Sequence, residues 1–228
     1  MKITFLGTGT SQGIPMIANN DPVCLSDNPR DKRLRSSIMI SWNDIRYIVD
    51  CGPDFRQQML RENIQSINGV LFTHEHADHT AGIDDLRPYT YKMGEVPIYA
   101  QERVIENLKV RFSYIFETEN RYAGAPKLTE NTIDSTSFIL HGVQVTPLAV
   151  MHGNLPITGY RFGNVAYITD LKTMSDQEKK KLENLEILIV NALRIDAHPT
   201  HLNLEEALAF VNEIKPKRAY FTSYNSST

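Results

Sequence analysis

Four side chains that can bind a metal ion lie within one segment of six residues. They are His74, His76, Asp78 and His79, and they follow the apolar residues 71–72 and Thr73. Imidazole and carboxylate groups suit zinc, manganese or iron, and a loop at a strand end can fold several of them around one point. A polar surface loop is the simpler alternative, but three of the seven histidines fall in this segment. The spacing therefore predicts a metal site.

The residues around this segment predict strands and helices that position it. Residues 69–73 read as a short buried strand, and the runs 38–42 and 46–50 read as a hairpin around Asn43-Asp44. Helical spacing covers residues 53–62 and 102–116. Further strands are predicted at residues 143–150, 158–162, 165–169, 185–192 and 219–222.

Two helix starts are predicted in the second half of the chain. Ser175 is a candidate N-cap, with Glu178 as its capping-box partner, for a helix through Leu182. Asn203 is a candidate cap for a helix over residues 204–214. Strands and helices thus recur in two similar halves, which suggests sheets packed between helical layers. Without repeats or linkers, we expect one domain over residues 1–228.

Composition and charge narrow the classes of function. The 24 basic and 27 acidic residues give a net charge of −3, so no global attraction to nucleic acid or to an anionic membrane is expected. A local basic run contains Arg30, Lys32, Arg33 and Arg35. It reads either as a solvated loop face or, less simply, as a site that attracts phosphate.

The compartment is predicted from three features of the chain. Two cysteines among 228 residues fit a reducing compartment better than a secreted disulfide scaffold. The N-terminus lacks the apolar core and the cleavage site of a signal peptide. No apolar stretch approaches the ~18 residues that would span a bilayer. A cytoplasmic protein without a membrane partner is therefore expected.

The spacing His-x-His-x-Asp-His resembles the hallmark of the metallo-β-lactamase-fold hydrolases, and the resemblance covers essentially the whole chain. Its supporting motifs are residues 5–15, Arg35-Ser36-Ser37, residues 49–53 and residues 167–170. Their order and spacing are most similar to the branch with the phosphodiesterase of phosphonate degradation and, further off, to transfer-RNA 3′-processing endonucleases. The resemblance implies an α+β fold, an αββα four-layer sandwich with two mixed sheets between helical layers.

The resemblance also implies six ligands for two divalent ions, zinc or manganese, with iron as a further option. In chain order they are His74, His76, Asp78, His79, His152 and Asp170. His152 would complete the first site with the first two histidines, and Asp170 would bridge the ions. On their own, these two residues could equally be a turn histidine and a cap.

The implied chemistry is hydrolysis. Two metals about 3.5–4 Å apart can share a hydroxide and bind two oxygens of a phosphate. Because the shared hydroxide is the nucleophile, no nucleophilic Ser or Cys is needed. Asp78 would contribute to catalysis as a metal ligand. His201 precedes a predicted helix N-terminus, where backbone amides favour phosphate, and is the candidate general acid. Asp50 looks like a residue that orients the ligand loop.

Ser223 departs from the family pattern. It stands where the family has its last histidine ligand, and the usual closing segment is expected to be missing. Because a hydroxyl is a poor replacement for imidazole, the second metal site is predicted to be weaker than the first. The alternatives are a ligand supplied by water or a neighbouring chain, and an altered, inactive end.

Hydrolysis of a small or cyclic phosphodiester is the leading functional hypothesis. Transfer-RNA processing is disfavoured by the negative charge and by the absence of a long basic arm, so nucleic acid is not an expected partner. Thioester or lactam hydrolysis stays chemically open. Ser223 favours a further alternative, a non-catalytic metal-binding protein. The oligomeric state is not determined by the sequence, and a homodimer is kept open.

Overall fold

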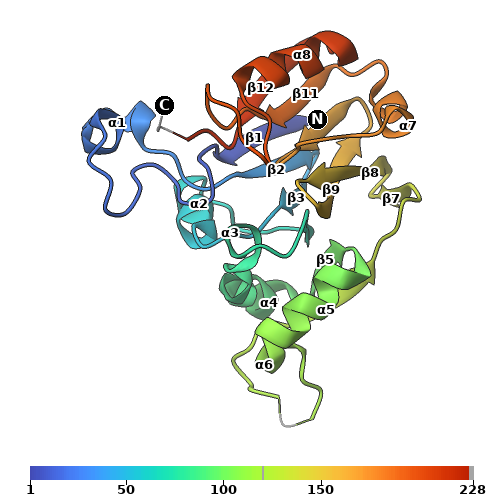
Figure 1. Ribbon diagram of the computed structural model, residues 1–228. Helices are drawn as coiled ribbons and strands as arrows, with labels where there is room; N and C mark the ends of the chain where they lie inside the picture. Colours follow the sequence, from blue (N-terminus) through green and yellow to red (C-terminus); the bar gives the residue numbers. More distant parts are fainter. Residues whose placement is uncertain (120, 226–228) are drawn as a thin grey trace. The chain divides into compact units, whose positions relative to one another are not determined.

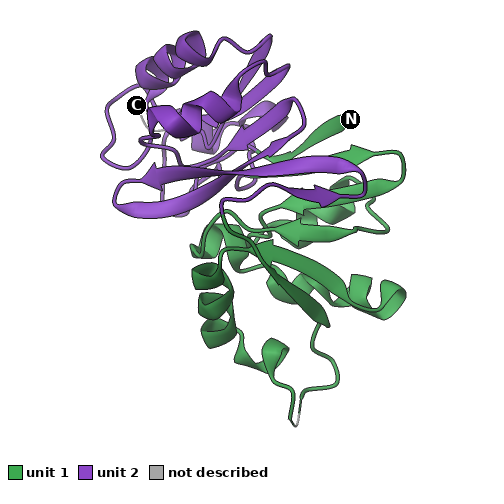
Figure 2. Ribbon diagram, turned by 90° about the vertical axis from the view of Figure 1, so that its right-hand side faces the viewer, with its two compact units in different colours: residues 1–7, 37–134 green, residues 8–36, 135–228 purple. Residues whose placement is uncertain are grey.

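The computed structural model describes residues 1–119 and 121–225 (Figure 1). The chain divides into two compact units, shown in separate colours in Figure 2, and each contains one six-stranded sheet. Unit 1 consists of residues 1–7 and 37–134, and unit 2 begins with residues 8–36 and resumes at residue 135. The expectation of a single domain over residues 1–228 stays a prediction.

The sheet of unit 1 is mixed. Its strands, in the order in which they pair, are β1 (Lys2–Gly7), β2 (Ser37–Trp42), β3 (Ile45–Val49), β4 (Gly69–Leu71), β5 (Val96–Ala100) and β6 (Leu128–Thr132). The pairs β1/β2 and β2/β3 are antiparallel, whereas β3/β4, β4/β5 and β5/β6 are parallel. β3 and β4 read as short apolar runs because parallel strands are covered on both faces.

Short helices cover this sheet and build its core. They are α2 (Phe55–Arg61), α3 (Ala77–Thr80), η2 (Ile83–Leu86), α4 (Arg87–Met93), α5 (Glu102–Arg111) and α6 (Ser113–Phe116). α5 places Val104, Ile105 and Leu108 in the core, at the i, i+1 and i+4 spacing of one helix face. These residues pack in one apolar cluster with strand residues such as Ile48 and Val70.

Unit 2 contains the second mixed sheet. Its strands, in pairing order, are β12 (Arg218–Thr222), β11 (Ile187–Asn191), β10 (Val165–Ile168), β9 (Leu155–Phe162), β8 (Val143–His152) and β7 (Phe138–Leu140). The three pairs from β7 to β10 are antiparallel, and β10/β11 and β11/β12 are parallel. Ile168, Leu188 and Val190 from this sheet share an apolar cluster with Phe210.

The helices of unit 2 are α1 (Pro22–Leu25), η1 (Pro29–Asp31), α7 (Asp176–Lys179), η3 (Lys180–Leu182) and α8 (Leu204–Ile214). Asn203 caps α8 in a complete capping box with Glu206. Ser175 caps α7 by accepting from the Glu178 amide, but the Glu178 carboxylate accepts from the Ala149 amide and is not the reciprocal partner that the sequence predicts.

The fold class is confirmed as α+β with two mixed sheets and helices. The predicted helix over residues 102–116 is interrupted at Phe112, whose φ of −125° and ψ of 42° separate α5 from α6. β4 ends at Leu71, so Thr73 already belongs to the loop, and β8 extends to His152. Among the described residues, no helix is both long enough and apolar enough to cross a membrane.

Candidate metal centre

The ligand loop of unit 1 follows β4 and enters α3. Phe72 donates its amide to the Tyr99 carbonyl and thereby continues the sheet for one residue. His74 is fully buried, and His76 is the N-cap residue of α3. Asp78 and His79 lie within this one-turn helix, and His79 is only 2% exposed. A strand end and a tight helical turn thus bring four ligand side chains together.

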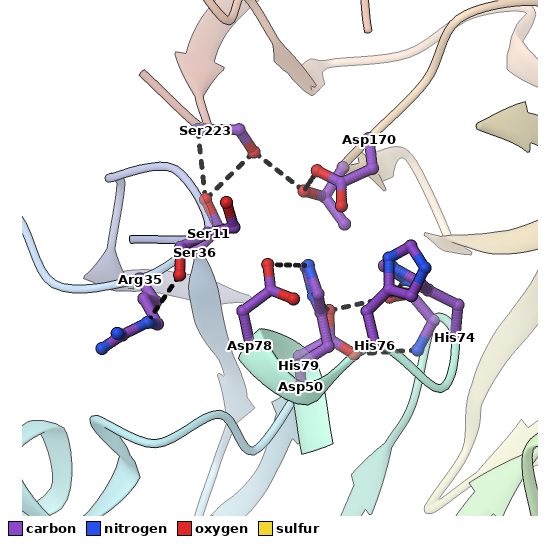
Figure 3. Close-up of polar contacts among 12 residues, drawn as sticks. Ser11, Arg35, Ser36, Asp50, His74, His76, Asp78, His79, Asp170 and Ser223 are labelled. Carbon is purple, nitrogen blue, oxygen red and sulfur yellow. Dashed lines mark hydrogen bonds and ion pairs between the residues drawn. The ribbon is translucent and has the colours of Figure 1, made fainter. Parts of the chain in front are cut away.

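These four side chains form two pairs of ligand atoms, which Figure 3 shows. His74 Nε2 and His76 Nδ1 are 3.0 Å apart, and His79 Nε2 and one Asp78 oxygen are 3.2 Å apart. Two ligand atoms that bind the same tetrahedral zinc ion at ~2.1 Å are roughly 3.3 Å apart. A ligand nitrogen of His74 also lies within 4.8 Å of one of His79. The donor types and their spacing therefore fit metal ions.

Outer partners fix the orientation of two of these imidazoles. The Thr73 hydroxyl donates to Asp50 Oδ2 at 2.9 Å, and it lies 2.9 Å from His74 Nδ1. His79 Nδ1 lies 2.7 Å from Asp50 Oδ2. Because the Thr73 hydroxyl donates its hydrogen to Asp50, the Nδ1 atoms of His74 and His79 are both assigned as donors. The Nε2 atom of each ring then carries the lone pair. A carboxylate behind a ligand histidine is a common arrangement in metal sites.

Asp50 is held at the centre of this arrangement. Its Oδ1 accepts from the Thr73 amide at 2.8 Å, and its own backbone is left-handed with a φ of 68°. Complete burial raises the pKa of its carboxyl, while the contacts with His79 and Thr73 oppose that rise. These contacts support the predicted role of Asp50 in orienting the ligand loop.

The loop after Asp50 packs directly against α3. The Cys51 amide donates to the His79 carbonyl at 2.8 Å. At Gly52 an added Cβ would lie 2.0 Å from the Asp78 carbonyl oxygen, so only glycine fits this contact. The same loop therefore fixes both the backbone and the side chain of His79.

Unit 2 holds the other predicted ligands. His152 is the last residue of β8, and its Nδ1 donates to the Thr200 carbonyl at 2.8 Å, so its Nε2 presents a lone pair. Asp170 follows β10 with a left-handed φ of 55° and is 5% exposed. Both side chains thus have an orientation that is fixed by their own unit.

Buried hydroxyl groups connect Asp170 to Ser223 (Figure 3). Thr169 donates to Asp170 Oδ1 at 3.0 Å, so its oxygen accepts from the Ser223 hydroxyl at 2.9 Å. Ser223 Oγ also lies 3.0 Å from Ser36 Oγ, and Ser36 donates to the Gly9 carbonyl at 2.9 Å. The Ser223 hydroxyl is therefore part of a network that supports Asp170.

His201 lies in a group of three histidines in unit 2. Its ring centroid is 4.5 Å from that of His152 and 5.0 Å from that of His198, and its Nδ1 is 3.7 Å from an Asp170 oxygen. Burial, Arg194 and the other nearby cationic groups lower the pKa of His198. The Thr200 amide donates to His198 Nδ1 at 3.3 Å, so His198 helps to shape the loop before His201.

Several hydroxyl groups behind the predicted ligands are not predicted from the sequence. Thr73 and Thr169 were seen only as strand residues, although each stands directly before a ligand candidate. A hydroxyl residue at the end of an apolar strand, next to His or Asp, was the available signal. The link from Ser36 to Ser223 joins residues 187 positions apart, which no local pattern shows.

Comparison with known proteins agrees with this geometry. The family model described as the β-lactamase superfamily domain matches residues 45–224. A crystal structure titled as a new diphosphatase from the PhnP family is 38% identical, covers 97% of this chain and 85% of that chain, and has a TM-score of 0.90. The chain therefore belongs to the β-lactamase superfamily, in the branch that contains the PhnP family.

Two curated relatives carry different names. An octanoyltransferase of Porphyromonas gingivalis is 39% identical over 94% of this chain, but the chain spans only 44% of that protein's length. A ribonuclease Z of Methanococcus maripaludis is 24% identical over all of this chain and 68% of its own length. The predicted family is thus confirmed, and it has hydrolase members.

Proposed function

We propose that this protein is a metal-dependent hydrolase of small phosphodiesters. The observation that carries the proposal is the presence of two separate ligand pairs in the loop of unit 1, at 3.0 Å and 3.2 Å. Two pairs call for two metal positions, the arrangement that suits phosphate ester cleavage. As the family resemblance implies, this proposal takes His152 as a further ligand of the first position and Asp170 as a ligand of both.

Bound divalent ions would supply charge for the phosphate and an activated water. The protein's own residues prepare that site. Asp50 and Thr73 keep the His74 and His79 rings in one tautomer, and the Thr169 hydroxyl fixes one Asp170 oxygen. His201, close to Asp170 and to the amides at the start of α8, is proposed to give a proton to the leaving oxygen.

The substrate class is supported by the PhnP-family diphosphatase, which is 38% identical over 85% of its chain. The name diphosphatase points to a reaction at phosphorus rather than at carbonyl carbon. The octanoyltransferase name supports acyl transfer less well. Cys51 is fully buried and burial raises the pKa of its thiol, and Cys24 is 5% exposed, so neither thiol is placed as an acyl acceptor.

RNA is the second candidate substrate, and the basic run is the feature that would serve it. Two of its arginines are used inside unit 2. Arg33 donates to the Thr8 hydroxyl at 3.0 Å and lies over the Tyr224 ring, and Arg35 donates to the Ser11 carbonyl at 2.7 Å. Because both guanidinium groups are bound to unit 2 itself, they are less available to bind an RNA backbone. This favours a small phosphodiester over RNA as the substrate.

The direct test is turnover of bis(p-nitrophenyl) phosphate with added Mn²⁺ or Zn²⁺. We expect turnover that is lost in His74→Ala and retained in His141→Ala, a matched control in the turn between β7 and β8. In Ser223→His, which places an imidazole where the resemblance expects the family's last ligand, we expect turnover to rise. Absence of turnover in both parent and Ser223→His, with either metal, would overturn the proposal. Salt-sensitive binding in an RNA gel shift would favour the second candidate.

A further inference from the structure

Helix α5 contacts the ligand loop within unit 1 through two arginines. Arg103 and Arg111 are eight residues apart, close to two helical turns, so they lie toward the same side of the helix. Both reach the segment between His74 and Thr80, and neither belongs to the predicted ligand set. From the sequence alone, this helix is only a periodic pattern of apolar and charged residues.

Arg111 bonds to the backbone of the ligand loop. Its Nη1 donates to the Glu75 carbonyl at 2.6 Å and to the Thr80 hydroxyl at 3.1 Å. Thr80 is fully buried, and its hydroxyl in turn donates to the His76 carbonyl at 2.8 Å. The guanidinium also lies over the Phe112 ring, 5.3 Å from its centroid, which limits its conformations. One side chain therefore supports the peptide groups of both Glu75 and His76.

Arg103 bonds to the side chain in the middle of the loop. Its Nη1 donates to Glu75 Oε1. Glu75 stands between the two histidines of the first ligand pair, and its side chain is 17% exposed, against 39% for Arg103. The pair therefore fixes the residue that joins His74 to His76 in the chain.

We propose that Arg111 and Arg103 are positioning residues for the first metal site, with Glu75 as their shared attachment point. The proposal rests on the metal-dependent function argued above. Its physical basis is that two ligand atoms 3.0 Å apart must be held together before the ion arrives. Without the arginines the loop would have to be ordered by the metal itself, at a cost in affinity.

Charge alone predicts the opposite effect, because removing a cation near a metal site should strengthen metal binding. Arg111 is an exposed residue, so water and salt screen its charge. The charge of Arg103 is paired with Glu75. Loss of the hydrogen bonds should therefore outweigh the relief of repulsion, and the sign of the change in affinity distinguishes the two effects.

The test is the Zn²⁺ affinity of the full chain, measured by competition with a chelating dye, together with the visible spectrum of the Co²⁺ form. We expect Arg111→Met to weaken Zn²⁺ binding by about 10-fold to 100-fold, the range found for outer partners of metal ligands. Arg103→Met should weaken it as well. Arg111→Lys should recover part of the affinity, because both hydrogen bonds come from one nitrogen.

Lys109→Met is the matched control, because Lys109 lies on the same helix and pairs with Glu106 and Glu130 instead of the ligand loop. Its Zn²⁺ affinity should equal that of the parent. Unchanged or tighter Zn²⁺ binding by folded Arg111→Met would overturn the inference, even if the melting temperature of its metal-free form falls. A parent chain that binds no Zn²⁺ would instead contradict the proposed function.

Discussion

At the residue scale, the chemistry of this site depends on which nitrogen of each imidazole is hydrogen-bonded to the protein. His74 and His79 use Nδ1 for contacts with Thr73 and Asp50, and His152 uses Nδ1 for the Thr200 carbonyl. Each ring therefore presents Nε2 as a ligand atom. His76 is different, because its Nδ1 is the atom that lies 3.0 Å from His74 Nε2.

Asp50→Asn tests this arrangement. The Asp50 carboxylate accepts two hydrogen bonds from Thr73 and one from His79. An amide has one oxygen, so its NH₂ group would face a donor in either orientation. We expect metal affinity to fall about 10-fold to 100-fold, measured by chelator competition. Asp44→Asn, in the exposed turn between β2 and β3, should leave the affinity unchanged; an equal loss in both variants would contradict this role for Asp50.

At the scale of secondary structure, the candidate residues stand where regular elements end. The ligand loop lies between β4 and α3, Asp170 follows β10, and His201 precedes the cap of α8. Backbone groups at such ends have no partner within the element, so they are available to bind loops. This explains why the Cys51 amide bonds to the carbonyl of His79.

The cap of α8 is the element on which the position of His201 depends. The Asn203 side chain accepts from the Glu206 amide at 2.8 Å and donates to the Ile195 carbonyl at 3.1 Å. Asn203→Ala should lower the free energy of unfolding by about 1–2 kcal/mol, measured by urea denaturation. Glu205→Ala, also in the first turn, should cost only a few tenths of a kcal/mol. A cost for Asn203→Ala no larger than that of Glu205→Ala would show that the cap contributes little.

At the scale of the whole molecule, each unit combines one apolar cluster with a set of buried polar groups. In unit 1 these include His74, Asp50 and Thr73, and in unit 2 they include Ser36, Thr169 and Asp170. Burying such groups costs free energy unless each is hydrogen-bonded. A bound metal ion would be a further partner for the ligand atoms among these buried groups.

Metal removal should therefore lower the thermal stability. A ligand that binds only the folded state adds about 2.7 kcal/mol at one hundred times its dissociation constant. For a chain of this size that corresponds to a drop in Tm of roughly 5–10 °C on chelation. The measurement is thermal unfolding with and without EDTA. His74→Ala, which removes a ligand of the first position only, should show a smaller drop, and an equal Tm of the parent in both conditions would contradict a tightly held ion.

The sequence by itself determined the ligand loop. Its four ligand side chains lie within six residues after an apolar strand, and this local signal needs no knowledge of the rest of the chain. The hairpin around Asn43 and the cap at Asn203 were likewise set by neighbouring residues. β5 and β6 were missed, because Pro97 interrupts the apolar run of β5 and because β6 consists largely of polar residues.

Only the tertiary structure decided what supports the ligands. Asp50 meets His79 across 29 residues, Arg111 meets Glu75 across 36, and Ser36 meets Ser223 across 187. The physical reason is that periodicity and capping act within a few residues, whereas these contacts follow from how strands and helices pack. Ligand identity is thus local information in this chain, and ligand orientation is a property of the folded units.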